Sequence, residues 1–169
     1  VPSSEVSLLD TVLAADTERA TLLLEAETAS EGARIAEIQT RLADINAWSA
    51  EGRASSILKG LGFDAAEQRM PCSGFSGGWR MRVALAAVLF AQPDLLLLDE
   101  PTNYLDLEGA LWLENYLVKY PHTVIIISHD RALLNRSVGA ILHLEDKKLT
   151  YYTGPYDQFA RQRAERRAM

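Results

Sequence analysis

At 169 residues and 18.7 kDa, the chain is long enough for one globular domain with a hydrophobic core. Its net charge of -6 argues against a surface that binds nucleic acid over its whole extent. The single cysteine, Cys72, excludes an internal disulfide and suits a reducing compartment. The apolar runs at 83–91 and 95–98 are too short to cross a bilayer, and no signal peptide is recognisable, so we expect a cytoplasmic protein without membrane insertion.

The first 74 residues are predicted to be helical. Apolar residues recur at helical spacing over 5–29 and again over 33–48, with a breaker at 30–32 between them. The simplest interpretation is two antiparallel helices, followed by a third helix over 53–63 that ends in glycines. Because the region is acidic, an ordinary helical subdomain is favoured over the alternative of an arm that projects towards a partner.

Residues 75–130 are predicted to alternate helix and strand. A helix is expected over 77–91, and "LLLLDEP" at 95–101 predicts a strand buried on both faces. A second helix is expected over 106–120, and "TVIIISHD" at 123–130 predicts a second buried parallel strand. The apolar side chains expected on or near one face of that second helix are Leu107, Leu111, Tyr116 and Leu117.

The remaining residues predict a short helix, a hairpin and a final helix. The short helix is expected near 131–137, and "AILHLEDKKLTYYTG" at 140–154 reads as two strands around a polar turn. A helix with a basic end follows from residue 156. The whole order predicts an α/β protein: a parallel sheet, an α-helical insertion before it and a C-terminal β-hairpin.

Polar side chains come directly after the two predicted parallel strands. Asp99 and Glu100 follow the first strand and His129 follows the second, so the carboxyl edge of the sheet could bring them together. Four apolar residues followed by Asp-Glu form the Walker B pattern, in which the aspartate helps to hold Mg²⁺, often through water, and the glutamate can act as general base. A strand that merely ends in solvated acids competes for "LLLLDE" alone. That alternative is poor with "PTNYLD" directly after it.

The stretch "FSGGWRMR" at 75–82 predicts a helix start that suits an anion. Ser76 is a good N-cap, and Trp79 stands where a capping box would need Glu or Gln. Gly77 and Gly78 keep side chains away from the first N–H groups, where the helix dipole is positive. For "SGG" alone, a capped helix with a glycine-rich lead-in is the simpler interpretation.

Three ordered stretches together carry a family resemblance: "FSGGWRMRVALA", "LLLLDEPTNYLDLEGALWLENYL" and "TVIIISHDRALLN". Over 75–136 the chain resembles the ATP-binding cassette (ABC) superfamily, specifically the ABC-F branch, whose members are soluble and act on ribosomes. The segment 149–166 resembles the part of ABC-F proteins that leaves the first cassette and enters the linker to a second. The resemblance implies that the sheet is part of a P-loop NTPase-type core.

The resemblance implies roles for two groups of residues that act across a pair of cassettes. Ser76, Gly77 and Gly78 match the signature motif, which contacts the γ-phosphate of ATP bound to the opposite cassette. Asp106 matches the D-loop aspartate, which communicates across the cassette dimer. The implied partner is a second cassette, in the same chain or in a dimer.

The resemblance also assigns the catalytic set. Asp99 matches the Walker B residue, which holds Mg²⁺ through water. Glu100 matches the catalytic base, and His129 matches the switch histidine that senses the γ-phosphate of ATP. For His129 the alternative is an ordinary strand-end histidine, but its position and the following Asp130 favour the functional interpretation. His143 matches no motif and is expected to be a surface or packing residue.

The chain departs from a complete cassette because it has no GxxxxGK[ST] phosphate loop, the Walker A motif. We therefore expect a fragment of one cassette that is inactive alone. Its expected parts are a helical subdomain or arm (1–74), the signature, Walker B, D-loop and H-loop half of the ATPase core (75–154), and the start of an inter-cassette linker helix (155–169). Tyr104 stands where ABC-F members often have histidine, and we expect little effect from it.

Three functions follow from these expectations. The leading hypothesis is a fragment of an ABC-F ATPase that binds and hydrolyses ATP between two cassettes and acts in translation, with the ribosome or its tRNA as partner. The alternative is the ATP-binding subunit of a membrane ABC transporter. The third is a non-catalytic interaction module, which applies to the isolated chain.

Overall fold

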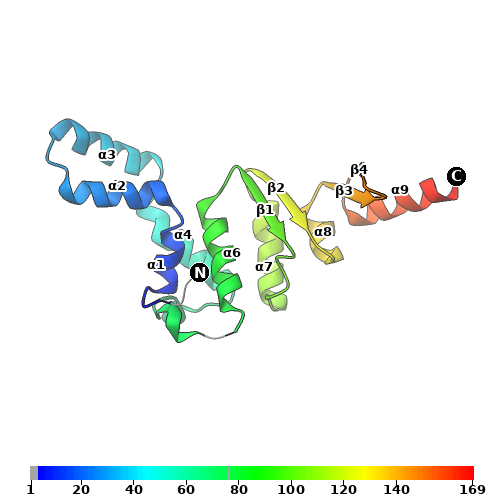
Figure 1. Ribbon diagram of the computed structural model, residues 1–169, viewed down its shortest axis with the longest axis horizontal. Helices are drawn as coiled ribbons and strands as arrows, with labels where there is room; N and C mark the ends of the chain where they lie inside the picture. The colour runs from blue at the N-terminus through cyan, green and yellow to red at the C-terminus, as the bar shows by residue number, and fades with distance from the viewer. Residues whose placement is uncertain (1–3, 76) are drawn as a thin grey trace. The chain divides into compact units, whose positions relative to one another are not determined.

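A computed structural model of the chain describes residues 4–75 and 77–169 (Figure 1). The chain forms two compact units, Val1–Leu96 and Leu97–Met169. The first unit is helical, and the second combines helices with strands. This confirms the predicted α/β class, with a helical part before the sheet and a hairpin near the C-terminus.

The first unit is built around three packed helices. Helices α1, α4 and α6 contact one another, and their core side chains Leu8, Leu58 and Val83 are fully buried. The elements of this unit are α1 (Leu8–Leu13), α2 (Thr17–Thr28), α3 (Gly32–Asp44), the 3-10 turn η1 (Ala47–Ser49), α4 (Ala50–Gly60), α5 (Ala65–Gln68), the 3-10 turn η2 (Cys72–Gly74) and α6 (Trp79–Ala91).

The single helix predicted over 5–29 is wrong, because the structure divides it into α1 and α2. The division follows from Asp16, whose side chain accepts a hydrogen bond from the Arg19 backbone N–H at 3.0 Å. This is an N-cap, and it starts a new helix within a stretch whose apolar spacing is continuous.

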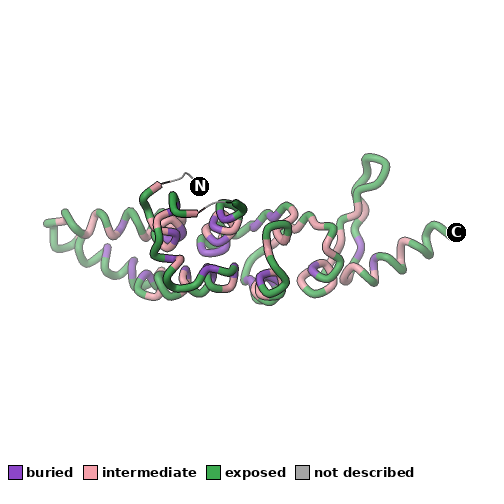
Figure 2. The backbone as a smooth tube through the Cα atoms, turned by 90° about the horizontal axis from the view of Figure 1, so that it is seen from below, coloured by how far each residue is buried: buried purple, intermediate pink, exposed green. Residues whose placement is uncertain are grey.

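Helices α2 and α3 form the predicted helical hairpin, and they lie side by side in Figure 1. Buried positions are sparse along it and alternate with exposed ones (Figure 2). The small core between the helices consists of Leu22, Ile38, Leu42 and Ala47. With so little buried apolar area, polar contacts across the hairpin contribute more to its geometry than they do in the α1–α4–α6 core.

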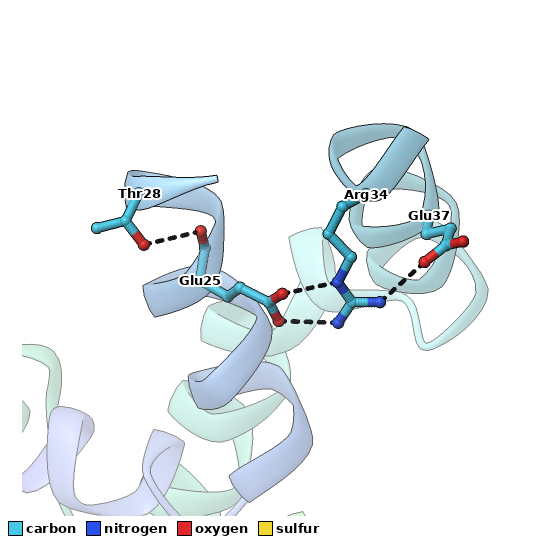
Figure 3. A network of polar contacts seen from close by, with 4 residues as sticks. All are labelled: Glu25, Thr28, Arg34 and Glu37. Carbon is cyan, nitrogen blue, oxygen red and sulfur yellow. Dashed lines mark hydrogen bonds and ion pairs between the residues drawn. The ribbon is translucent and has the colours of Figure 1, made fainter. Parts of the chain in front are cut away.

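Ion pairs join α2 to α3 along their length. Arg34 on α3 grips Glu25 on α2 with two parallel hydrogen bonds of 2.7 and 2.8 Å, and it also reaches Glu37 at 3.0 Å (Figure 3). Arg41 pairs with Glu18 in the same way. The hydrogen bonds from these guanidinium groups lower the pKa of Glu25 and of Glu18.

The second unit contains two small sheets. Strand β1 (Leu95–Asp99), which crosses the boundary between the units, pairs with β2 (Thr123–Ile127) in the predicted parallel sheet. Strands β3 (Ala140–Glu145) and β4 (Lys148–Thr153) form the predicted antiparallel hairpin, in which Leu142 lies opposite Tyr151. The helices of this unit are α7 (Leu107–Val118), α8 (Arg131–Ser137) and α9 (Tyr156–Ala168).

The prediction that β1 and β2 are buried on both faces is wrong. On β1, Leu98 is 7% exposed while its neighbour Leu97 is 64% exposed, and on β2 Ile127 is 59% exposed. Successive side chains of a strand point to opposite faces, so one face of each strand is open. A continuous run of leucine or isoleucine contains no alternation that could have shown this in the sequence.

The buried face of α7 also differs from the expected one. Of the four side chains expected on that face, Leu117 is buried, whereas Leu107 is 75% exposed. The residues that α7 buries are Gly109, Leu113, Glu114 and Leu117. They follow the i, i+4 spacing of one helix face, and this face includes a glutamate that an apolar pattern does not select.

Helix α9 covers one face of the β3–β4 hairpin. Phe159 is 5% exposed, and its ring centre lies 5.1 Å from that of His143 and 5.0 Å from that of Tyr152. Arg163 and Arg167 both reach the Glu145 carboxylate, which lowers the pKa of Glu145. His143 is therefore a packing residue, as expected, and the C-terminal helix is held to the hairpin.

Candidate functional site

The site begins where β1 ends. Glu100 follows the last strand residue and has a φ of 48°, in the left-handed region. A non-glycine residue held there stores roughly 1–3 kcal/mol of backbone strain. The Glu100 backbone N–H donates a 2.7 Å hydrogen bond to the Ile127 carbonyl at the end of β2, and this bond holds the strained residue in place.

Glu100 and His129 are brought together at the ends of the two paired strands. The His129 Nδ1 atom contacts Glu100 Oε1, and the His129 backbone N–H donates to Glu100 Oε2 at 3.4 Å. The Glu100 side chain is 24% exposed, and the His129 side chain is 97% exposed. A half-sheltered carboxylate thus lies against an imidazole that faces solvent, an arrangement that can orient and polarise a water molecule.

The loop that carries His129 is fixed by the hydrogen bonds of its neighbours. The Asp130 side chain caps α8 by accepting from the Leu133 backbone N–H at 3.1 Å, and the Asp130 backbone N–H donates to Ser128 Oγ at 2.9 Å. The role of Asp130 in positioning the loop was not predicted from the sequence. An Asp that directly precedes a short apolar helix was the available signal.

Asp99 and Asp106 occupy different positions around the same turn. Asp99 is exposed at the end of β1. Asp106 caps α7 by accepting from the Gly109 backbone N–H at 2.8 Å. A Cβ atom at Gly109 would lie 3.1 Å from the Asp106 carboxylate, so glycine lets this cap close tightly. Asp106, the residue predicted to be the D-loop aspartate, is thus the N-cap of α7.

The donors fit Mg²⁺ only as a companion of a nucleotide. Among the described residues no group of three or more His, Cys, Asp or Glu side chains is arranged to hold a metal ion. Mg²⁺ that accompanies a nucleotide usually takes one or two carboxylates and completes its shell with water and phosphate oxygens. The exposed Asp99 carboxylate suits that smaller contribution.

The glycines predicted to contact phosphate lie in the helical unit. Gly77 has a φ of 79°, and Gly78 is the N-cap residue of α6, which begins at Trp79, two residues later than expected. Gly78 has no side chain that could accept a hydrogen bond from the first N–H groups of α6. Ser76, predicted as the cap and as part of the signature, lies outside the described residues.

An aromatic cluster anchors the start of α6. Trp79 is 2% exposed, and its ring centre lies 5.9 Å from that of Phe75, which in turn lies 5.9 Å from that of Phe63. The helix start is therefore tied to the core of the helical unit, while Gly77 and Gly78 remain exposed.

Two matches to protein families decide the relationship. Residues 5–103 match a family model described as ABC transporter, and residues 142–169 match a second model with the same description. The chain belongs to the ABC transporter family. Within the part of the chain that the structure describes, no helix has the length and apolar character needed to span a bilayer.

Similar proteins place this ABC chain near sub-family F. It is 48% identical over 169 residues to the mouse ATP-binding cassette sub-family F member 2, covering 98% of this chain and 27% of the relative. It is also 48% identical over 166 residues to the "Probable ATP-binding protein YheS" of Haemophilus influenzae, covering 96% of this chain and 26% of the relative. These matches confirm the predicted resemblance to ABC-F proteins.

A solved ABC cassette confirms the fold. The dimeric structure of a post-hydrolysis state of the cassette MJ0796, bound to ADP and Pi, aligns with a TM-score of 0.54 at 21% identity. The alignment covers 88% of this chain and 56% of that cassette. The ABC chain described here therefore has the fold of part of a cassette, and it spans about a quarter of the length of the curated relatives above.

Proposed function

We propose that the whole protein is an ATPase that binds and hydrolyses ATP between two cassettes. The observation that carries this proposal is the contact between Glu100 and His129 at the ends of two paired strands. In this proposal Glu100 is the general base that removes a proton from the attacking water. His129 holds the Glu100 carboxylate on one side and presents its exposed ring to the γ-phosphate of ATP.

The backbone of Glu100 prepares it for this role. The left-handed conformation and the hydrogen bond to Ile127 fix the position of the Glu100 Cα. The carboxylate is therefore preorganised for the attacking water. Asp99, next to it, holds Mg²⁺ through water, and bound Mg²⁺ neutralises charge on the phosphates. Asp106, at the start of α7, couples this site to the opposite cassette.

The signature residues serve a nucleotide held by the other cassette. Ser76, Gly77 and Gly78 precede a helix whose first N–H groups can bind phosphate oxygens. The positive φ of Gly77 supports this role, because a residue with a side chain would be strained there. The dimeric structure of the related cassette supports a second cassette as partner.

We further propose that the protein acts in translation, with the ribosome or its tRNA as partner. The similarity to sub-family F proteins supports this part of the proposal. In this proposal, residues 1–74 form the helical subdomain or arm, residues 75–154 the signature and catalytic half of the core, and residues 155–169 the start of the linker. The α2–α3 hairpin and α9 would make the ribosomal contacts.

A first experiment tests the catalytic assignment. Glu100→Gln in the full-length protein should lower the turnover of ATP at this site by roughly 100-fold or more, because the base is removed while the shape is kept. Glu108→Gln, an exposed glutamate on α7, is the matched control and should turn over ATP at the wild-type rate. Wild-type turnover by Glu100→Gln would show that Glu100 is not the base. The isolated chain, without a phosphate loop, should show no turnover.

A second experiment tests the translational role. Full-length Glu100→Gln protein should co-sediment with ribosomes when ATP is present and not when it is absent, because trapped ATP keeps the cassettes closed. Free protein in both samples at low salt, with ATP shown to be bound, would instead favour the ATP-binding subunit of a membrane transporter.

A further inference from the structure

Helix α8 is the element that carries the loop of His129, and it is too short to hold its own position. It begins at Arg131, two residues after His129, and contains seven residues. A helix of this length is only marginally stable alone, so its place is set by the neighbours it packs against. Leu133 is fully buried, and α8 packs on α7.

A buried carboxylate on α7 is paired with a cation on α8. The Glu114 side chain is 6% exposed, and its Oε2 atom accepts a hydrogen bond from Arg136 Nη1 at 3.3 Å. A buried carboxylate is costly unless a cation and hydrogen bonds accompany it. If a neutral residue replaced Arg136, the Glu114 carboxylate could regain contact with water only by opening the packing between α7 and α8.

The other flank of α8 is held by α9. The Asn135 side chain accepts a 2.9 Å hydrogen bond from the Asp157 backbone N–H in the first turn of α9, and the Arg131 guanidinium lies 5.4 Å from the centre of the Tyr156 ring. Since α8 is held on both sides, a loss on the α7 side alone should tilt it rather than release it.

We propose that Glu114 and Arg136 are positioning residues for His129. Their ion pair sets α8 against α7, and through Asp130 it sets the loop that places the imidazole against Glu100. The inference rests on the proposed catalytic roles of Glu100 and His129. It concerns the rate of the chemical step, because neither Glu114 nor Arg136 touches the reacting atoms.

The test measures steady-state ATP turnover by the full-length protein. The difference in turnover between the wild type and Glu100→Gln is taken as the turnover of this site. Arg136→Gln should lower kcat for that part between roughly tenfold and a hundredfold, the scale expected for a small misplacement of a catalytic group. The KM for ATP should change by less than about twofold. Arg69→Gln, an exposed arginine of the helical unit, is the matched control and should keep the wild-type kcat.

Two further variants separate positioning from general damage to the fold. Arg136→Lys keeps the cation and should recover most of the lost kcat. The double variant Glu114→Gln/Arg136→Gln removes both charges, so no unpaired carboxylate remains, and its kcat should lie within about threefold of wild type. A double variant as slow as Arg136→Gln would overturn the inference.

The remaining outcomes tell the two proposals apart. Wild-type kcat in Arg136→Gln, with turnover abolished in Glu100→Gln, would overturn the positioning role and leave the catalytic assignment intact. Wild-type turnover in Glu100→Gln would overturn the catalytic assignment, and the positioning role with it. If Arg136→Gln fails to fold, the kcat values of Arg136→Lys and of the double variant decide whether the positioning role holds.

Discussion

The helical unit and the β1–β2 sheet differ in how completely they cover their own apolar side chains. In the helical unit, Leu8, Leu58 and Val83 are fully buried by neighbouring helices. In the sheet, Leu97 and Ile127 remain more than half exposed. The helical unit therefore buries its core among its own helices, whereas the strands that carry the catalytic candidates leave one apolar face exposed.

The largest expected effect tests the closed core. Leu58→Ala should destabilise the helical unit by about 2–5 kcal/mol, because it leaves a cavity at a fully buried position. Leu24→Ala, on the exposed side of α2, should change the stability by less than about 0.5 kcal/mol. Urea unfolding followed by circular dichroism measures both. Equal losses from the two variants would show that the core is not closed as described.

A smaller effect sharpens the comparison within a single strand. Leu98→Ala should cost about 2–3 kcal/mol, whereas Leu97→Ala, one residue away on the other face, should cost less than about 1 kcal/mol. Chemical denaturation of this chain gives both values. If the two substitutions cost the same, the face of Leu97 is covered in solution, for example by self-association, which a concentration series would reveal.

The smallest expected effect concerns the α2–α3 hairpin, where ion pairs supplement a small core. The pKa of Glu25 is lowered by Arg34, so the stabilisation from this pair is fully present above the ordinary glutamate pKa of 4.5 and is lost as the pH falls through the lowered value. The melting temperature of Arg34→Gln should therefore fall less steeply below pH 4.5 than that of the wild type. Glu27→Gln, an exposed residue of α2, should leave the steepness unchanged.

A pH profile of Arg34→Gln that parallels the wild type would show that the hairpin gains nothing from this pair. High salt offers a second check, since screening weakens exposed ion pairs and should bring the wild-type profile closer to that of Arg34→Gln.

Much of the fold and part of the site could be predicted from the sequence. Periodicity and breakers were sufficient for most of the helices, for the strands and for the hairpin, and strand order was sufficient to expect Glu100 near His129. The break before α2 was missed because a polar cap at Asp16 outweighed a continuous apolar pattern. The buried face of α7 was missed because it contains Glu114, whose burial depends on Arg136, a partner 22 residues away.

Other features had no signal in the sequence at all. Four consecutive leucines fit a strand covered on both faces as well as one covered on a single face, so the exposure of Leu97 depended on what packs beside the strand. The roles of Ser76, Gly77 and Asp106 towards a nucleotide stay predictions.

The left-handed backbone at Glu100 carries a consequence for how this sequence can vary. Glycine would occupy that conformation without strain, so selection for stability alone would favour glycine at this position. A glutamate at this position therefore lowers the stability of the fold. Directed evolution of the chain for heat tolerance alone, without selection for activity, should replace Glu100 with glycine.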